Sequence, residues 1–255
     1  MKGKSSGILL LVSLACLLSF IATANAQEHD PVFQVSTIGA INGGVYDGAM
    51  TVGELAKHGD YGLGATHALG GELVVIQGQF YEFGADGRAR RLAEDDTATF
   101  AAVTFFNPEV TIEVEGALSQ QDVEALLLEH IVNRNVIHAV VVTGRFAHIR
   151  TRTPASQTKP YPPLAEVLKD QFEYDFYDVT GTMIGYWTPG YLSGIHAPGF
   201  HFHFIVDRGQ ASVEGAHGGH VLAYETAGAT LSIDLKDRLE VVFPVSDPDF
   251  QGLEL

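Results

Sequence analysis

The chain has 255 residues, of which 46% are hydrophobic and 18% charged, and its formal net charge at pH 7 is −16. This length and composition predict folded globular structure rather than a disordered chain. The excess of acidic residues, without any basic cluster, argues against nucleic-acid binding, which needs clustered Lys and Arg to neutralise phosphates.

The first 26 residues predict a secretory signal peptide. Two lysines precede an apolar run over residues 8–21, and the small-residue triplet Ala24-Asn25-Ala26 follows it. The run is about 14 residues long, shorter than the roughly 20 that span a bilayer as a helix. We therefore expect cleavage after Ala26, a secreted or periplasmic protein, and no stable membrane anchor after cleavage.

Cys16 is the only cysteine, and it lies within this signal. Its removal excludes disulfides and cysteine-held metals from the mature chain. Any metal ion would then have to be held by His, Asp or Glu side chains.

The segment after the signal is expected to mix short strands and helices. Thr51-Val-Gly-Glu54 has capping-box spacing and predicts a short helix that ends at Gly59. We expect the glycine-rich stretch 61–71 to be a loop. Strands are expected at 73–77, 79–83, 97–106, 110–116 and 135–153, with a tight turn at Gly78 between the first two.

The clearest helix covers residues 119–131. Ser119 and Asp122 have the spacing of a helix start, and the apolar positions recur at helical intervals. A proline-containing connection follows the strand at 135–153 and is the best candidate for a domain boundary.

The second half is expected to be mostly strand after a short helix at 163–172. The strands are predicted at 174–187, 201–206, 220–225, 229–235 and 239–245. We predict an α+β fold of two α/β domains, each built on a mixed β-sheet: an N-terminal domain at 27–155 and a β-rich C-terminal domain at 156–255.

Five of the eleven histidines fall within residues 196–220. His201 and His203 alternate with phenylalanines on a predicted strand, so both imidazoles should point to the same face. His220 begins the next strand, and a hairpin would bring it beside them. This arrangement predicts a three-histidine site for zinc or another divalent first-row metal, with His220 preferred as third ligand and His217 as its rival.

Charged residues at strand ends could complete such a site. Glu72 is followed directly by an apolar run, so its carboxylate should be desolvated and need a partner. Glu214 and Glu225 are alternatives with weaker context. Arg150 and Arg152 end a strand rich in Val and Ile, and a guanidinium there suits carboxylate binding.

Five segments, taken together and in this order, resemble the acetolactate decarboxylases, and the resemblance covers about residues 33 to 250. The segments are GDYGLGATHALGGELVVIQGQFY, RFAHIRTRT, KPYPPL, GFHFHF and GGHVL. The resemblance implies an active-site zinc held by His201, His203 and His220. It also implies catalytic roles for Glu72 and Arg152, a small-molecule substrate, 2-acetolactate, and a homodimer.

The chain departs from the family pattern at three places. The stretch GQASVEGA lengthens the loop between His203 and His220. Ala65 stands where the family usually has threonine, and Thr66 follows one place later. The family carries a further glutamate on a C-terminal extension, which we expect to be absent here, with Glu254 as the nearest acid.

The activity implied is decarboxylation of 2-acetolactate to acetoin and carbon dioxide. The alternatives are a cupin-like metal-dependent oxygenase or isomerase, a secreted zinc hydrolase, and a non-enzymatic metal-binding protein. The first lacks the expected glutamate shortly after His203, and no HExxH helix supports the second.

Overall fold

The structure is a computed structural model that describes residues 29–207 and 215–253. The predicted signal peptide with Cys16, and the candidate residues Glu214 and Glu254, lie outside the described residues. Among the described residues, no helix has both the length and the apolar character needed to cross a membrane.

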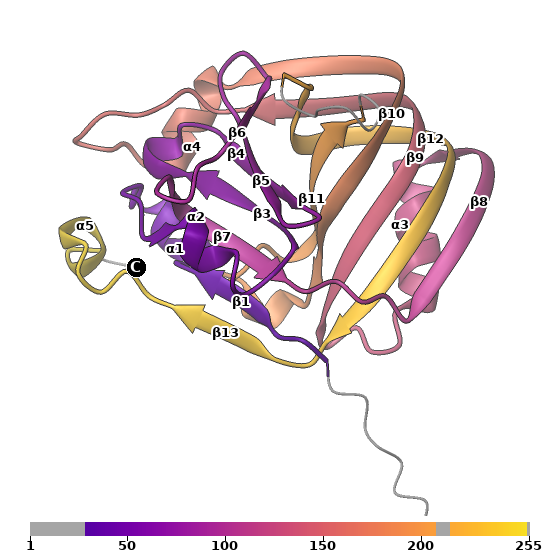
Figure 1. The fold of residues 1–255 in the computed structure, drawn as a ribbon, viewed down its shortest axis with the longest axis horizontal. Helices are drawn as coiled ribbons and strands as arrows, with labels where there is room; N and C mark the ends of the chain where they lie inside the picture. The colour runs from indigo at the N-terminus through magenta and orange to yellow at the C-terminus, as the bar shows by residue number, and fades with distance from the viewer. Residues whose placement is uncertain (1–28, 208–214, 254–255) are drawn as a thin grey trace, which may run out of the picture.

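Two β-sheets form the body of the molecule (Figure 1). The eight-stranded sheet has the order β13-β1-β7-β3-β4-β5-β6, with β2 paired to β7. Its strands are β1 Val32–Val35, β2 Met50–Thr51, β3 Tyr61–Thr66, β4 Glu72–Ile76, β5 Gln79–Phe83, β6 Ala89–Arg91, β7 Thr97–Thr104 and β13 Leu239–Val242.

The five-stranded sheet has the order β11-β10-β9-β12-β8, and β11 also pairs with β12. Its strands are β8 Val110–Ser119, β9 Ile137–Thr153, β10 Phe172–Thr188, β11 Gly199–Val206 and β12 Gly218–Lys236. The helices are α1 Ile38–Asn42, α2 Val52–Leu55, α3 Gln120–His130, α4 Leu164–Val167 and α5 Pro248–Gln251, with 3₁₀ turns at His67–Leu69, Leu168–Asp170 and Gly190–Leu192.

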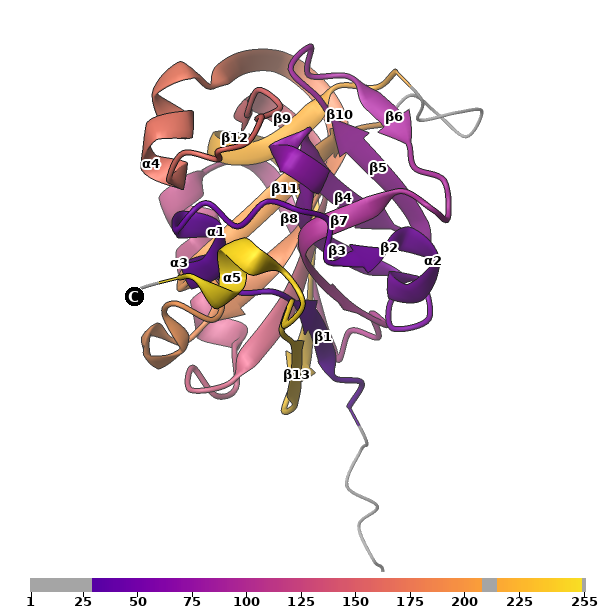
Figure 2. The same cartoon turned by 90° about the vertical axis from the view of Figure 1, so that its left-hand side faces the viewer.

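The elements stack in layers, with α2 on one side and α3 on the other (Figure 2). Leu63 and Ala102 of the eight-stranded sheet pack against Ala139 and Tyr186 of the five-stranded sheet. On the outer face of the five-stranded sheet, α3 packs its buried residues on alternate residues of the long strands. Because β9 is covered on both faces, its apolar run is nearly continuous rather than alternating.

The predicted helix starts are confirmed. The Ser119 hydroxyl accepts from the Asp122 backbone N–H, and the Asp122 carboxylate accepts in return from the Ser119 backbone. The Thr51 side chain accepts from the Glu54 backbone N–H and begins α2. These local hydrogen bonds can be read from sequence because both partners lie within one helical turn.

The expectation of a loop at 61–71 is wrong for its first half, which forms β3. Its glycines permit close strand packing: a Cβ at Gly62 would lie 2.2 Å from the Ala102 carbonyl oxygen, and one at Gly64 would lie 2.1 Å from the Phe100 carbonyl oxygen. Glycine is a poor strand former in isolation, so the close approach of β7 overrides the local preference.

Two further expectations need correction. The predicted strands 220–225 and 229–235 are one strand, β12, which continues through a β-bulge near Gly228, where φ is +116°. Only the eight-stranded sheet is mixed, because β1 and β13 run parallel, whereas the strand pairs of the five-stranded sheet are antiparallel.

The α+β class with two sheets is confirmed. The division of the chain at residues 155 and 156 stays a prediction. Hydrogen-bonded strand pairs cross that point, since β9 pairs with β10 and β12, and β1 pairs with β13.

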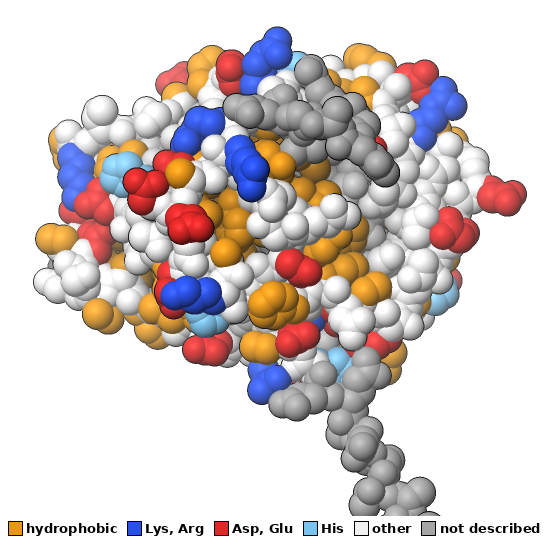
Figure 3. Space-filling model, in the orientation of Figure 1, with side chains coloured by type: hydrophobic (Ala, Val, Ile, Leu, Met, Phe, Trp, Pro, Cys, Tyr) orange, Lys and Arg blue, Asp and Glu red, His pale blue; other side chains and the backbone are white. Residues whose placement is uncertain are grey.

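On the face shown in Figure 3, basic side chains lie singly among acidic ones around areas of hydrophobic side chains. This mixed distribution of charge on the visible face gives no continuous positive surface there.

Replacing Gly62 by alanine should destabilise the fold. The new methyl group would press on the β7 backbone, and overpacking of this kind costs about 1–3 kcal/mol. Urea unfolding followed by circular dichroism measures the effect. Gly190→Ala is the matched control, because nothing lies within 4 Å of a Cβ added there. Equal stability of the two variants would contradict the packing account of β3.

Candidate metal centre

The alternation along β11 separates its imidazoles from its phenylalanines, as predicted, and Phe200 packs against the hydrophobic core beneath α3. Phe202 and Phe204 join the hydrophobic core beneath α3. His201 and His203 point to the opposite face, toward the eight-stranded sheet, where the His203 ring nitrogen Nδ1 donates to the Leu73 carbonyl oxygen at 2.8 Å. Because the proton of the neutral His203 ring is then on Nδ1, its Nε2 has the free lone pair that could bind a metal ion.

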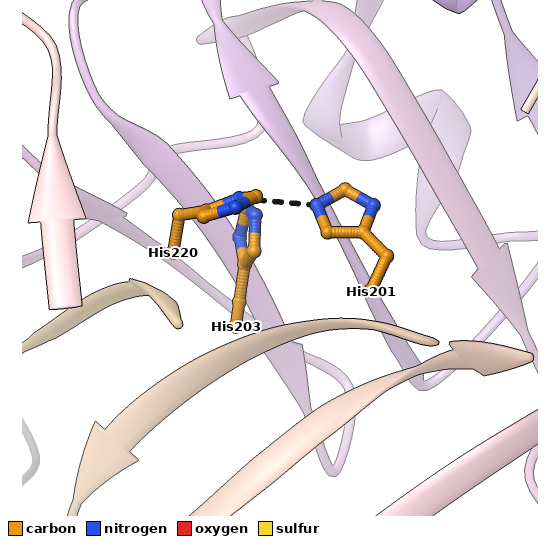
Figure 4. A group of neighbouring side chains, drawn as sticks. All are labelled: His201, His203 and His220. Carbon is orange, nitrogen blue, oxygen red and sulfur yellow. Dashed lines mark hydrogen bonds between the residues drawn. The ribbon is translucent and has the colours of Figure 1, made fainter. Parts of the chain in front are cut away.

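His220 joins these two residues because the β11–β12 ladder sets it opposite His203. Ring nitrogens of His201, His203 and His220 all lie within 4.8 Å of one another. The His201 Nε2 and His220 Nδ1 atoms are 3.1 Å apart (Figure 4). Three imidazoles that converge from two neighbouring strands form the arrangement of an open metal site.

Burial keeps these three rings neutral. It lowers the pKa of His203 to about 3, and it lowers the pKa values of His201 and His220 well below their ordinary range. Neutral imidazoles have free lone pairs, the form that a metal ion requires. The donor set therefore fits a divalent first-row metal such as zinc.

Glu72 and Arg152 lie beside the histidines. A Glu72 carboxylate oxygen is 3.5 Å from His203 Nε2, and the other is 3.9 Å from an Arg152 guanidinium nitrogen. Burial raises the pKa of Glu72 to about 7, although the positive charge of Arg152 opposes the rise. Arg152 comes from β9, where it lies opposite His220 in the ladder. This carboxyl group can therefore hold or release a proton near neutral pH.

The group opens into a cavity of about 310 Å³. The three histidines, Glu72 and Arg152 supply its polar wall. The remaining wall is largely apolar; it includes Phe200, next to His201 on β11, and from distant segments Ile38 of α1 and Leu164 of α4. From α3, the polar residues Gln120 and Glu124 also line the cavity. A small polar ligand could bind the metal group while its apolar parts contact these walls.

The other candidates lie elsewhere. His217 is not in the three-histidine group. Its backbone forms an isolated antiparallel β-bridge with Arg88, and its ring lies 5.4 Å from that of Phe176. Arg150 makes two 2.9 Å hydrogen bonds to Asp175 at the surface. Glu225 is exposed on β12.

Thr66 also has a structural partner. Its hydroxyl donates to Glu82 at 2.6 Å, so this group is engaged away from the histidines.

The sequence did not reveal the contributions of α1, α3 and α4 to the cavity. Ile38, Gln120 and Leu164 carry no motif, and each comes from a different part of the chain. Only the packing of the two sheets brings these segments to one space.

Comparisons with known proteins identify a family for most of the chain. Residues 32–255 match the family described as Alpha-acetolactate decarboxylase. A relative of that name from Methylococcus capsulatus is 38% identical over 86% of this chain and 81% of its own length. One from Bacillus subtilis is 35% identical over 89% of this chain and 91% of its own.

A crystal structure of alpha-acetolactate decarboxylase from Bacillus subtilis strain 168 has the same fold. Its TM-score is 0.83 at 34% identity, over 88% of this chain and 93% of that chain. The fold is thus that of a carboxy-lyase family. The chain belongs to the alpha-acetolactate decarboxylase family, which confirms the resemblance seen in the sequence.

Glu72 should make the stability of the metal-free protein depend on pH. Its folded-state pKa of about 7 lies above the ordinary value of 4.5, so stability falls as the pH rises between those values. We expect metal-free Glu72→Gln to be more stable than the unaltered chain at pH 8, by about 3 kcal/mol. The difference should disappear below about pH 4.5.

Urea unfolding in a chelating buffer at several pH values measures this difference. Glu115→Gln, at an exposed position on β8, is the control and should show no such trend. A pH-independent gain for Glu72→Gln would contradict the buried carboxyl's role.

Proposed function

We propose that the protein is a zinc-dependent acetolactate decarboxylase that converts 2-acetolactate to acetoin and carbon dioxide. The observation that carries this proposal is the convergence of three neutral, largely buried histidines with Glu72 and Arg152 on one cavity wall. Membership of the family supports the same substrate.

Decarboxylation requires a group that stabilises the electron pair of the broken carbon–carbon bond. When the carboxylate leaves as carbon dioxide, its electron pair forms a carbon–carbon double bond and the ketone oxygen gains negative charge. His201, His203 and His220 would hold the zinc ion, which would supply a Lewis acid for the substrate's oxygen atoms. With such a group the chain needs no organic cofactor.

Arg152 and Glu72 have separate roles in this proposal. Arg152 binds the anionic substrate through its guanidinium, which is shielded from water, with its side chain only 13% exposed. Glu72 holds a proton near neutral pH and delivers it to the carbon that lost carbon dioxide. Delivery from one fixed side would give one enantiomer of acetoin. Glu254 stays a predicted second acid.

The decisive experiment is acetoin formation from racemic acetolactate by the mature chain, without oxygen, against a no-enzyme blank. Activity should be lost to a chelator and restored by zinc. His201→Ala and His203→Ala should lose bound zinc and fall to the blank rate. Arg152→Lys should keep zinc but lose at least about tenfold in kcat/KM, because an ammonium cannot replace the planar guanidinium.

His217→Ala is the matched control, since this histidine lies nearby in sequence but outside the metal group. Retained zinc in both ligand variants would refute the site. An oxygen requirement would instead indicate a cupin-like oxygenase, and zinc binding without turnover would indicate a metal-binding protein.

We also propose that the chain is exported with cleavage after Ala26, and that the mature enzyme is a homodimer. The layout of residues 1–26 supports export, and the family resemblance supports the dimer. Expression in a bacterial host should give an extracytoplasmic chain whose N-terminal sequencing begins at Gln27. Light scattering should give twice the chain mass. A cytoplasmic chain that begins at Met1 would refute export.

A further inference from the structure

His196 is a buried imidazole near the metal group. It is 0% exposed and lies between the 3₁₀ turn at Gly190–Leu192 and β11. Its ring packs edge-on against Tyr186, with centroids 5.2 Å apart, and Tyr186 is the cross-strand neighbour of His201. His196 thus lies close behind His201.

Gln34 on β1 fixes which nitrogen of His196 carries the proton. The Gln34 amide nitrogen donates to the carbonyl oxygens of Ser36 and Ile195, each at 2.8 Å. This orientation leaves the Gln34 oxygen to accept from His196 Nδ1 at 2.8 Å. His196 is fully buried, and the Gln34 oxygen holds the proton of its neutral ring on Nδ1. Its Nε2 is therefore a lone-pair acceptor.

That acceptor is buried and has no hydrogen-bond partner among the described residues. A buried acceptor without a donor destabilises the fold. The structure therefore calls for a donor close to His196 Nε2.

His201, by contrast, needs a hydrogen-bond acceptor. Its Nε2 faces the other ligand nitrogens, as the 3.1 Å distance to His220 Nδ1 shows. When Nε2 binds a metal ion, the proton of the neutral ring is on Nδ1, which is also buried without a partner among the described residues. For His203 the same need is met by the Leu73 carbonyl oxygen.

We propose that His196 is a positioning residue that accepts the Nδ1–H of His201, directly or through one water molecule, when the metal is bound. The chain Gln34, His196, His201 would then orient the ligand ring and raise its basicity, as outer hydrogen-bond partners of metal-bound histidines do. The inference rests on the proposed metal site and adds a residue that no motif in the chain indicated.

The test compares His196→Phe with His138→Phe in the full mature protein. Phenylalanine keeps the aromatic packing but removes the acceptor. His138 is the matched control: it is 1% exposed, its Nδ1 lies 3.2 Å from the Val136 carbonyl oxygen, and its Nε2 also has no partner within the described part of the chain. It belongs to neither the cavity nor the metal group.

Zinc affinity, measured by competition with a chromophoric chelator, should fall about 10–100-fold in His196→Phe. It should be unchanged in His138→Phe, and His196→Gln, which keeps an acceptor oxygen, should recover part of the loss. In the cobalt-substituted protein, the N–H proton resonance of His201 should exchange with water faster in His196→Phe. Circular dichroism of each metal-free variant verifies folding.

Equal zinc affinity and equal N–H exchange in His196→Phe and the unaltered chain would overturn the inference. Equal losses in the His138 and His196 variants would also overturn it, because the effect would then be general destabilisation. Neither result depends on turnover, so the decarboxylase proposal stands or falls separately. An unaltered chain that binds no zinc would refute both.

Discussion

The constraint on which the site depends is that three imidazoles must remain neutral in a space closed by two sheets. The register between β11 and β12 sets His203 opposite His220. A slip of one residue would turn these side chains toward the opposite face. Burial then lowers their pKa values, so that their lone pairs stay free for a metal ion. The candidate metal site therefore depends on sheet register and burial together.

The eight-stranded sheet contributes further groups to the site on the five-stranded sheet. β4 brings Glu72 and the Leu73 carbonyl oxygen to His203, and β1 brings Gln34 to His196. The positive charge of the largely buried Arg152 of β9 lies beside the Glu72 carboxyl group. A buried carboxyl with a raised pKa and a buried guanidinium are both costly for folding, and such costs are commonly concentrated at functional sites.

Sequence patterns predicted the elements whose determinants are local. The starts of α2 and α3 depend on hydrogen bonds within one turn, and Gly78 allows the tight turn between β4 and β5 with φ +71°. The patterns failed at β3, whose glycines indicated a loop until β7 packed against them, and at β12, which a bulge carries through its glycine. In both cases contacts between strands outweighed local preference.

By itself, the sequence determined that His201 and His203 share a face, because side chains alternate along any strand. It also indicated Glu72 and Arg152 through family motifs. Only the tertiary structure decided that His220 rather than His217 joins the group, that Glu72 meets Arg152, and that His196 lies behind His201. These relations depend on register and packing between segments far apart in the chain, which local periodicity does not encode.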